Sequence, residues 1–595
     1  MRPSRPTGPL VALVAAAALA IGVGVAPASA HPPHPGHGGK VPVATGYGGA
    51  VATVDADATK VGLDVLRRGG NAVDAAVAAA ATLGVTEPFS SGIGGGGFFV
   101  YYDAASGQVH TIDGRETAPA AMRSDAFVEN GVPIPFADAV TSGLSVGVPG
   151  TPRTWATALE QWGSLDLRRA LRGATDVARR GFVVDQTFVD QTTANLARFS
   201  AFRSSSDLFL RRGAPPAVGS VFRNRDLAET YDLLARKGVD ALYTGRLAEE
   251  IVRTVQDPPV RRSSPLVVRP GLLQLGDLAS YQSPLRPPTL VSYRGLDVYG
   301  MAPPSSGGST VGEALNILEA SDLGDTTQTL HHYLEASALA FADRNRYVGD
   351  PAFVDVPLEE LLSDGFAAER ACLIDPTTAL PKPVAPGAPD GDYAACETTA
   401  VGTEGTDGQS TTHLTTADRW GNVVAYTLTI ESLGGNGIVV PGRGFLLNNE
   451  LTDFNFTDTQ GGVDPNLPGP GKRPRSSMAP TIILSDGAPF LALGSPGGST
   501  IITTVLQILV NRLELGMDLP AAVAAPRATQ RNTVAVQAEP GFDRTALQAL
   551  GHTFVDNPEI GAATGIEFLD DGSLLAVAEP VRRGGGSAAV VARGR

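Results

Sequence analysis

A predicted β-hairpin in the last third of the chain constrains its fold more than any other feature. The sequence TTHLTTADRWGNVVAYTLTIE begins at Thr411, and its turn is expected at DRWGN, residues 418–422. With that turn, Thr411 lies opposite Thr429. Because side chains alternate between the two faces of a strand, Thr427 and Glu431 share their face, and a slip of one residue would separate them. Threonine favours strands in general, so these hydroxyls alone do not establish a function.

Short apolar strands and one long helix follow this hairpin. The expected strands are GRGFLLNNE, PTIIL and PFLALGS, and the helix is expected over residues 499–515. Nearer the start of the chain, helices are expected over residues 57–70 and 71–85, the second with Asn71 as its N-cap and Asp74 at its third position. Strands grouped apart from helices predict an α+β fold of packed layers rather than βαβ units.

The charge of the chain argues against two classes of partner. It has 46 Lys and Arg residues against 61 Asp and Glu residues, which gives a formal net charge of −15. Nucleic acids and anionic membrane surfaces attract basic proteins, and no basic cluster stands out here. We therefore expect neither a nucleic-acid partner nor membrane binding.

The N-terminus has the pattern of an export signal. Two arginines within the first five residues precede an apolar run over residues 10–25, and the triplet A-S-A ends at Ala30. A membrane anchor is the weaker alternative, because the run is short and interrupted by glycines. We expect removal of residues 1–30, a disordered leader over residues 31–50, and a secreted protein, extracellular or periplasmic.

Neither the cysteines nor the histidines predict a metal or cofactor site. In an exported protein the two cysteines, Cys372 and Cys396, are expected to form a disulfide, with two free thiols as the alternative. No H-E-x-x-H motif occurs, and His331 and His332 have no further ligand at metal-binding spacing. The segment GIGGGG follows a helix and precedes a strand, which is the reverse of a dinucleotide-binding loop. No cofactor is expected.

Thr411 is a candidate nucleophile. A hydroxyl is a poor nucleophile without a neighbouring base, and in an N-terminal threonine that base is its own α-amine. Cleavage of the Ser410–Thr411 bond would create that amine, and the aperiodic segment over residues 383–410 suits a cleavage site. Downstream, the N–H groups of Gly497 and Gly498 could bind an oxyanion, although an ordinary turn is the alternative.

Segments along nearly the whole mature chain resemble the γ-glutamyltransferases (glutathione hydrolases), a family of the N-terminal-nucleophile hydrolase superfamily. In chain order they are GNAVDAAVAAA, GGGGFF, DGRETAPAAM, GVPG, PPSSGG, ADRNRYVGDPAFV, TTHLTTAD, LLNNELTDF, KRPRSSMAPT and GSPGGSTIITTVLQ. The resemblance implies a four-layer αββα sandwich made of two interwoven subunits from one precursor. The large subunit would cover residues 51–410, and the small catalytic subunit, residues 411–595, would begin with the nucleophile.

The resemblance also implies a role for individual residues by their position in these motifs. Thr411 resembles the nucleophile, with Thr429 hydrogen-bonded to it and Thr427 close by, and Gly497 and Gly498 correspond to the oxyanion donors. A guanidinium with hydroxyls matches a carboxylate, and carboxylates match an ammonium. The implied binding residues are Arg115, Ser476 and Ser477 for the α-carboxylate of the substrate, and Glu431, Glu450 and Asp453 for its α-ammonium.

Two features depart from parts of that family. Some members have Asn where this chain has Glu431, so the pocket here gains a negative charge. Members also differ in whether a lid covers the pocket at the stretch DFNFTDTQGGVDPNLPGPGKRPRS, residues 453–476, and this version is intermediate.

The activity implied is transfer of a γ-glutamyl group from glutathione or a related amide to Thr411, followed by its release to water or to the amine of an amino acid or peptide. One alternative is a cephalosporin (glutaryl) acylase of the same fold. The other is a non-catalytic exported protein that binds glutamate-like ligands. Cleavage at Thr411 would separate the last from both enzymes, because a catalyst of this kind has to be cut.

Overall fold

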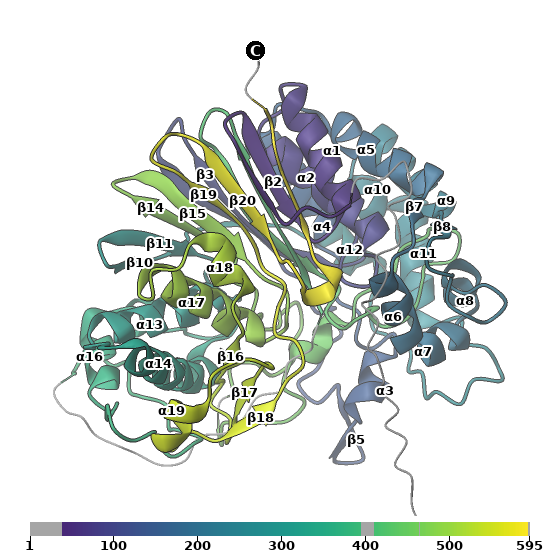
Figure 1. Cartoon of the computed structure of the whole chain (residues 1–595). Helices are drawn as coiled ribbons and strands as arrows, with labels where there is room; N and C mark the ends of the chain where they lie inside the picture. Colours follow the sequence, from purple (N-terminus) through teal and green to yellow (C-terminus); the bar gives the residue numbers. More distant parts are fainter. Residues whose placement is uncertain (1–38, 394–409, 463, 593–595) are drawn as a thin grey trace, which may run out of the picture. The chain divides into compact units, whose positions relative to one another are not determined.

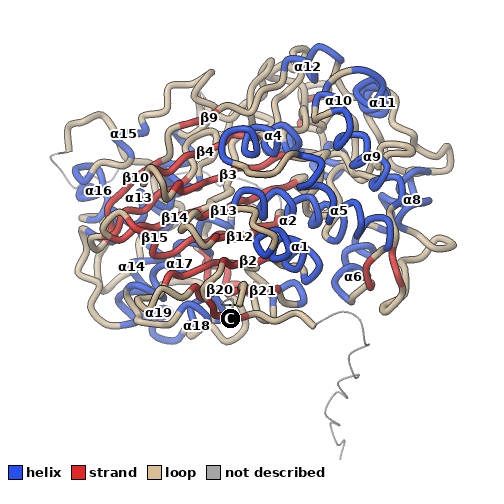
Figure 2. Tube along the Cα trace, turned by 90° about the horizontal axis from the view of Figure 1, so that it is seen from above, coloured by secondary structure: helices blue, strands red, loops and turns tan. Residues whose placement is uncertain are grey.

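Two seven-stranded antiparallel sheets pack face to face in this α+β protein (Figures 1 and 2). The computed structural model describes residues 39–393, 410–462 and 464–592. In spatial order, sheet 1 contains β1 (Val43–Gly46), β20 (Leu574–Ala578), β19 (Thr564–Phe568), β15 (Ala488–Gly494), β14 (Thr481–Ser485), β11 (Leu296–Gly300) and β10 (Thr289–Tyr293). Sheet 2 contains β21 (Ser587–Val590), β2 (Gly49–Thr53), β12 (Thr412–Asp418), β13 (Val423–Thr429), β3 (Gly96–Asp103), β4 (Gln108–Gly114) and β9 (Leu285–Arg286).

Helices pack against the outer face of each sheet (Figure 1). Sheet 2 is covered by α1 (Ala56–Arg67), α2 (Ala72–Thr86) and α4 (Thr151–Trp162), and sheet 1 by α13 (Gly307–Glu319), α17 (Thr500–Leu513) and α18 (Leu519–Ala524). Farther out, α5 (Leu167–Arg180) packs on α2, α9 (Arg225–Lys237) on α5, and α14 (Thr326–Tyr347) and α16 (Asp364–Ala371) on α13.

Smaller elements complete the described chain. The helices are α3 (Phe136–Val140), α6 (Gln186–Ala194), α7 (Leu196–Ala201), α8 (Arg203–Phe209), α10 (Asp240–Tyr243), α11 (Gly245–Gln256), α12 (Leu275–Ser280), α15 (Leu358–Leu361) and α19 (Thr545–Ala549), with 3₁₀ turns η1 (Glu450–Asp453) and η2 (Arg582–Gly584). The strands are β5 (Val128–Glu129), β6 (Val132–Pro133), β7 (Phe182–Val183), β8 (Val221–Phe222), β16 (Ala528–Thr529), β17 (Val536–Ala538) and β18 (Phe554–Asp556).

Side-chain alternation in β3 shows how the layers are held together. Phe98 and Val100 belong to the hydrophobic cluster that joins the two sheets, whereas Phe99 and Tyr101 belong to the cluster beneath α2. Because both faces of the strand are buried, it is apolar at nearly every position. The helix above it, α2, has every residue buried, and its alanines allow a close approach to the sheet.

Each sheet contains strands from both sides of the Ser410–Thr411 bond, and strands from the two sides pair with one another. In sheet 2, β12 pairs with β2 and β13 pairs with β3, and in sheet 1, β14 pairs with β11 and β20 pairs with β1. Cutting the chain before Thr411 would therefore leave the two pieces joined by hydrogen-bonded strands within two common cores.

The structure confirms the predicted hairpin and the cap of α2. Thr412 pairs with Leu428 and Ala417 with Val423, which is the expected register around the DRWGN turn. Asn71 and Asp74 form a capping box at the start of α2. The predicted strands PTIIL and PFLALGS correspond to β14 and β15, and the long helix after them is α17.

Two local predictions were wrong. The leader was expected to be disordered to residue 50, but β1 begins at Val43 and β2 at Gly49, because their hydrogen-bond partners come from the distant strands β20, β12 and β21. The segment GRGFLLNNE is not a strand. It has a single bridge, between Val439 and Leu446, and then enters η1.

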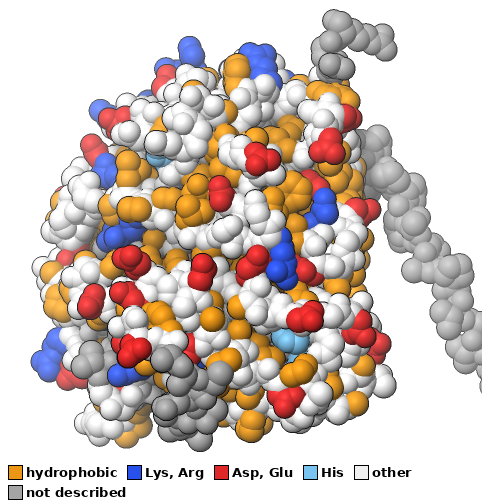
Figure 3. Space-filling view, turned by 90° about the vertical axis from the view of Figure 1, so that its left-hand side faces the viewer, with side chains coloured by type: hydrophobic (Ala, Val, Ile, Leu, Met, Phe, Trp, Pro, Cys, Tyr) orange, Lys and Arg blue, Asp and Glu red, His pale blue; other side chains and the backbone are white. Residues whose placement is uncertain are grey.

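The charged side chains can be followed on one face of the molecule. On the face in Figure 3, basic side chains are scattered between acidic ones rather than gathered into a patch. None of the helices in the described part of the chain combines the length and the apolar character needed to span a bilayer.

Cys372, after α16, is not a free thiol. Its predicted partner Cys396 lies outside the described residues, so the pairing stays a prediction.

Candidate active site

Thr411 lies immediately before β12 at the end of the hairpin in sheet 2. Its Oγ1 atom is 3.2 Å from Oγ1 of Thr429, across the strand pair, and its hydroxyl also donates to the carbonyl oxygen of Ser410. Arg583 donates from Nη1 to the carbonyl oxygen of Thr411 at 2.6 Å. The hydroxyl is thus aimed at the peptide bond that precedes it, while both the strand and an arginine hold its backbone.

Glu431 reaches the same place through an unusual backbone conformation. The strand ends at Thr429, and Glu431 has a φ of +74°, in the left-handed region that a non-glycine residue rarely adopts. Its N–H donates to Oγ1 of Thr429 at 2.9 Å, and Ser432 donates to its carboxylate at 2.5 Å, as does Asn449. Strain of this kind commonly occurs at functional sites.

Arg115 is buried directly after β4 and lies at the centre of the charged groups. Its Nε and Nη2 atoms donate to the carbonyl oxygens of Pro474 and Arg475, each at 3.0 Å. Nη1 donates to Glu450 and Nη2 to Asp453. The guanidinium therefore faces two carboxylates from η1, and an incoming carboxylate would have to compete with them.

Ser476 and Ser477 are positioned by residues from α13 and α14, more than 100 residues earlier in the chain. The N–H and hydroxyl of Ser306, at the start of α13, donate to the carbonyl oxygen of Ser476, each at 2.7 Å. Arg344, on α14, donates to Oγ of Ser477 at 2.6 Å and to Oγ of Ser306 at 2.8 Å. Arg344, which is buried, thus holds the start of α13 and the 476–477 segment together.

Most of the predicted site residues line one cavity. Its wall is formed by Arg115, Ser410, Thr411, Thr429, Glu431, Glu450, Asp453, Ser476, Ser477, Met478, Gly498 and Ile501. Residues far apart in sequence converge here because η1 and the 476–478 segment lie at the same end of the β12–β13 hairpin. A nucleophile candidate, a guanidinium and three carboxylates in one small cavity suit a substrate that carries both charges next to an acyl group.

Two predicted catalytic residues are not among those lining the cavity. Thr427 Oγ1 lies 2.7 Å from Nδ1 of His413, so its hydroxyl is bonded two residue pairs along the hairpin from Thr411. Gly497 is adjacent to the lining residue Gly498. Both glycines have positive φ values, and a Cβ on Gly497 would lie 2.5 Å from Oγ1 of Thr500. This turn therefore requires glycine.

Burial and repulsion between carboxylates control the charges in this cavity. Burial raises the pKa of Glu450 well above its usual range, although Arg115 opposes the shift. Burial, together with Asp453 and Glu450, likewise raises the pKa of Glu431. Burial acts against the charge of Arg115, but Glu450 and Asp453 more than compensate and hold its pKa above its usual value. The cavity is therefore suited to bind an additional cation.

The stretch between Asp453 and Ser476 packs on segments that precede Ser410. Phe456 stacks on Phe127 with ring centroids 4.4 Å apart, and the N–H of Ala118 donates to the carbonyl oxygen of Lys472 at 2.8 Å. These contacts fasten both ends of the stretch beside the cavity.

The sequence did not single out several residues that hold the site. Arg344, Asn449 and Arg583 all bond to predicted site residues, yet each is distant in sequence from its partner. Arg344 and Asn449 do fall within the family-like segments ADRNRYVGDPAFV and LLNNELTDF. Position within those segments was the available signal, whereas nothing in the sequence VRRGGG pointed to Arg583.

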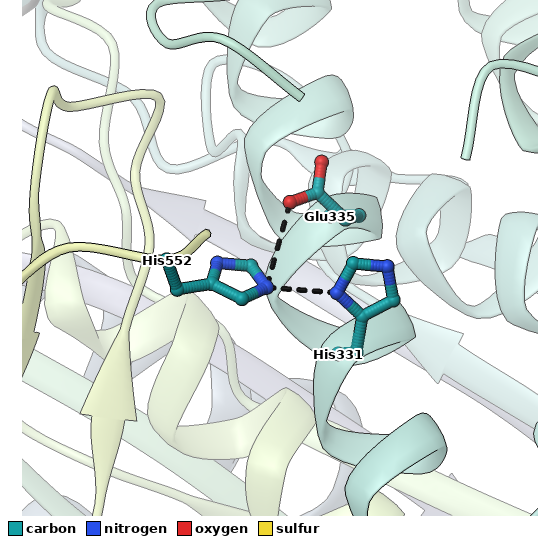
Figure 4. A group of neighbouring side chains, drawn as sticks. All are labelled: His331, Glu335 and His552. Carbon is teal, nitrogen blue, oxygen red and sulfur yellow. Dashed lines mark hydrogen bonds and ion pairs between the residues drawn. The ribbon is translucent and has the colours of Figure 1, made fainter. Parts of the chain in front are cut away.

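A second cluster, away from the cavity, contains possible metal ligands that the sequence did not associate. His331 and Glu335 of α14 meet His552, and their donor atoms lie within 4.8 Å of one another (Figure 4). His331 Nδ1 and His552 Nε2 are 2.8 Å apart, and Lys382 Nζ lies 2.7 and 2.9 Å from the two oxygens of Glu335. Because this ammonium already neutralises the carboxylate, we assign no metal to the cluster.

Replacing Thr429 with alanine should slow both cleavage before Thr411 and turnover. One lost hydrogen bond to an oxygen that develops charge is worth roughly 1.5–3 kcal/mol, or about 10–100-fold in rate. Thr429→Ser is the matched control, because it keeps the hydroxyl. Rates of cleavage on a denaturing gel and of substrate turnover test this, and unaltered rates in the alanine variant would show that the 3.2 Å contact has no role.

The chain matches known proteins along most of its length. Residues 58–589 match the family described as "Gamma-glutamyltranspeptidase". The chain is 39% identical over 558 residues to "Glutathione hydrolase proenzyme" of Bacillus subtilis strain 168, covering 91% of this chain and 92% of that one. It is 35% identical over 570 residues to "Acylase ACY 1 proenzyme" of Pseudomonas sp. strain SE83, covering 92% and 96%. The crystal structure of cephalosporin acylase from Bacillus halodurans superposes with a TM-score of 0.82 at 30% identity, covering 96% and 100%.

Proposed function

The chain belongs to the γ-glutamyltranspeptidase family, and from that premise we propose that it is an exported, self-processing glutathione hydrolase and γ-glutamyltransferase with Thr411 as its nucleophile. It is an enzyme of the glutathione hydrolase and γ-glutamyltransferase family. One observation carries the assignment of the nucleophile: the Thr411 hydroxyl lies against both the Ser410 carbonyl and the Thr429 hydroxyl, in a cavity with one guanidinium and three carboxylates. We also infer that the helix–sheet–sheet–helix packing is the αββα sandwich of N-terminal-nucleophile hydrolases.

Self-processing would begin with attack of Thr411 Oγ1 on the carbonyl carbon of Ser410. The new C–O bond replaces the Ser410–Thr411 C–N bond, and the nitrogen takes up a proton to become the α-amine of Thr411. Water then hydrolyses the ester, which leaves a carboxylate on Ser410 and restores the hydroxyl. The contact between Thr411 Oγ1 and the Ser410 carbonyl supports this direction of attack.

Turnover would use the same oxygen of Thr411. The freed α-amine takes the proton of the Thr411 hydroxyl while Oγ1 attacks the γ-amide carbonyl carbon of the donor. The N–H groups of Gly497 and Gly498 are the proposed oxyanion donors, since preorganised amides stabilise such charge strongly. The leaving amine takes the proton, and water or an acceptor amine then cleaves the γ-glutamyl ester of Thr411.

The charged groups of the cavity support a γ-glutamyl donor. We assign Arg115, Ser476 and Ser477 to its α-carboxylate. Charge-assisted hydrogen bonds of this type are about twice as strong as neutral ones. Glu431, Glu450 and Asp453 are assigned to its α-ammonium, because their mutual repulsion is relieved by a bound cation.

A cephalosporin (glutaryl) acylase is the second candidate, because the acylase relative and the acylase structure match over almost their whole lengths. A glutaryl group has the carboxylate of a glutamyl group without the ammonium. The carboxylates assigned to the ammonium therefore favour the γ-glutamyl donor. Export rests on the signal pattern of the first 30 residues, and the mature protein would be extracellular or periplasmic.

The test is an assay of the purified full-length product with a chromogenic γ-glutamyl anilide, combined with a denaturing gel and N-terminal sequencing. We expect two bands, the smaller beginning at Thr411, and release of the chromophore to water and, faster, in the presence of acceptor amines. A single uncut band without turnover would instead support a non-catalytic binding protein.

A further inference from the structure

Glu116, the residue after Arg115, is completely buried and its carboxylate has no hydrogen-bond donor among the described residues. The same holds for Oε2 of Glu450, whose Oε1 accepts from Arg115. The two carboxyl groups are within hydrogen-bonding reach of each other. Burying two carboxylates without donors is costly, and one proton held between them would satisfy both.

The backbone around Glu116 leaves room for its side chain and little more. A Cβ on Gly96, in β3, would lie 2.5 Å from Oε2 of Glu116, and a Cβ on Gly147 would lie 2.8 Å from its Cβ. Glycine at these two positions therefore accommodates the carboxyl group in a fixed place. It lies behind Glu450, and it is not among the residues that line the cavity.

The charges of the surrounding groups indicate which carboxyl holds the proton. If all were ionised, Glu116, Glu431, Glu450 and Asp453 would place four negative charges around the single positive charge of Arg115. The guanidinium bonds to Glu450 and Asp453 but not to Glu116. Glu450 is thus the better anion, and Glu116 the better acid.

The other groups facing Glu116 do not change this assignment. Besides Arg115, Glu450 and Asp453, they are the tyrosines Tyr243, Tyr281 and Tyr426, whose pKa values burial raises, so they stay neutral. Burial raises the pKa of Glu116 to about 8, against the opposing effect of Arg115, and it raises the pKa of Glu450 as well. The direct hydrogen bond from Arg115 to Glu450 is the geometric reason to place the proton of this pair on Glu116.

We propose that Glu116 is a positioning residue that stays protonated at neutral pH and donates its proton to Oε2 of Glu450. The carboxylate of Glu450 is thereby kept ionised and oriented between Arg115 and the α-ammonium of the donor. This role rests on the proposed γ-glutamyl function for its substrate, but the proton on Glu116 does not depend on it. When Glu116 ionises in alkaline solution, the two carboxylates repel and the site gains a negative charge, which weakens binding of the donor's α-carboxylate.

Two variants separate the hydrogen bond that Glu116 donates from its ability to ionise. Glu116→Gln keeps a hydrogen-bond donor of the same shape and cannot ionise, whereas Glu116→Leu removes the donor. In the processed enzyme, the wild-type KM for a γ-glutamyl anilide should rise above about pH 8, and this rise should be absent in E116Q. E116L should raise KM at neutral pH by about 10–100-fold with a much smaller change in kcat, and E116Q should recover most of that loss.

The comparison has an internal control, because the donor's own ammonium titrates identically with all three proteins. An alkaline rise in KM that persists unchanged in E116Q would overturn the proposal, as would an E116Q variant as impaired as E116L. Infrared difference spectra supply a readout that needs no turnover. The carbonyl stretch of a protonated carboxylic acid should be stronger in the wild type than in E116Q at neutral pH and should weaken in the wild type above about pH 8. If the wild type turned over no γ-glutamyl anilide, the proposed function would fail, and equal acid bands in the two proteins would still reject the proton on Glu116.

Discussion

Replacing Thr411 with alanine should leave one uncut chain with no turnover above background. The same oxygen is the proposed nucleophile for cleavage of the Ser410–Thr411 bond and for attack on the donor. Among the described residues, its hydrogen-bond partners are the Ser410 carbonyl and the Thr429 hydroxyl. Neither can replace it as a nucleophile. A denaturing gel and the γ-glutamyl anilide assay on the same preparation measure both losses.

Thr411→Ser is the control for that variant, because it restores the hydroxyl and can still expose an α-amine after cleavage. We expect it to be cut and active at a reduced rate. The uncut alanine variant should remain folded, because the sheets pair strands from both sides of the bond whether or not it is cut. A cut alanine variant would show that an outside protease does the processing, and an active one would exclude the mechanism.

The central hairpin was predictable because its determinants are local. The carboxylate of Asp418 accepts N–H groups from Trp420 and Asn422 at 2.9 and 3.1 Å, which closes the turn where the sequence placed it. With the turn set, the register of two seven-residue strands places Thr412 opposite Leu428, and the hydroxyls of Thr411 and Thr429 meet just beyond that pair. The cap of α2 was predictable for the same reason, since Asn71 and Asp74 are three residues apart.

What the sequence missed depends on contacts between distant segments. β1 is a strand only because β20 supplies its partner, from more than 500 residues away. Glu431 shares the face of Thr429 in the sequence pattern. In the structure it reaches the cavity by leaving the strand with a positive φ and by bonding to Ser432 and Asn449. The support from Arg344 and Arg583 likewise arises only when segments far apart in the sequence pack together.

The same limit explains why Glu116 was not selected from the sequence. In the motif DGRETAP, Arg115 is recognisable as a ligand for a carboxylate, whereas the adjacent glutamate has the composition of an ordinary ion-pair partner. Only the structure shows that the guanidinium of Arg115 bonds to Glu450 and Asp453 instead, and leaves Glu116 buried without a donor.

The α-ammonium of the donor should matter as much as its acyl group. We expect kcat/KM for a γ-glutamyl anilide to exceed that for the matching glutaryl anilide by at least about 10²-fold, since sites built around a polar group commonly reject analogues that lack it by ~10⁴ or more. The physical reason is that Arg115 is already paired with carboxylates of the protein. Its charge is already shared between Glu450 and Asp453, so a third carboxylate can enter only if a cation arrives with it. A γ-glutamyl donor carries that cation, and a glutaryl donor does not.

Asp453→Asn tests the origin of this preference. The amide keeps the size of the side chain and removes one negative charge beside Arg115, so the γ-glutamyl donor loses a partner for its ammonium, while the glutaryl donor meets less repulsion. The ratio of the two kcat/KM values should therefore shrink, mainly because the γ-glutamyl rate falls. Arg123→Gln is a suitable control, because Arg123 is exposed and pairs only with the exposed Asp125 among the described residues. Its ratio should equal that of the wild type. Comparable rates on the two wild-type reactions would reject the transferase and favour the acylase, since they would mean that the three carboxylates of the cavity do not recognise an ammonium.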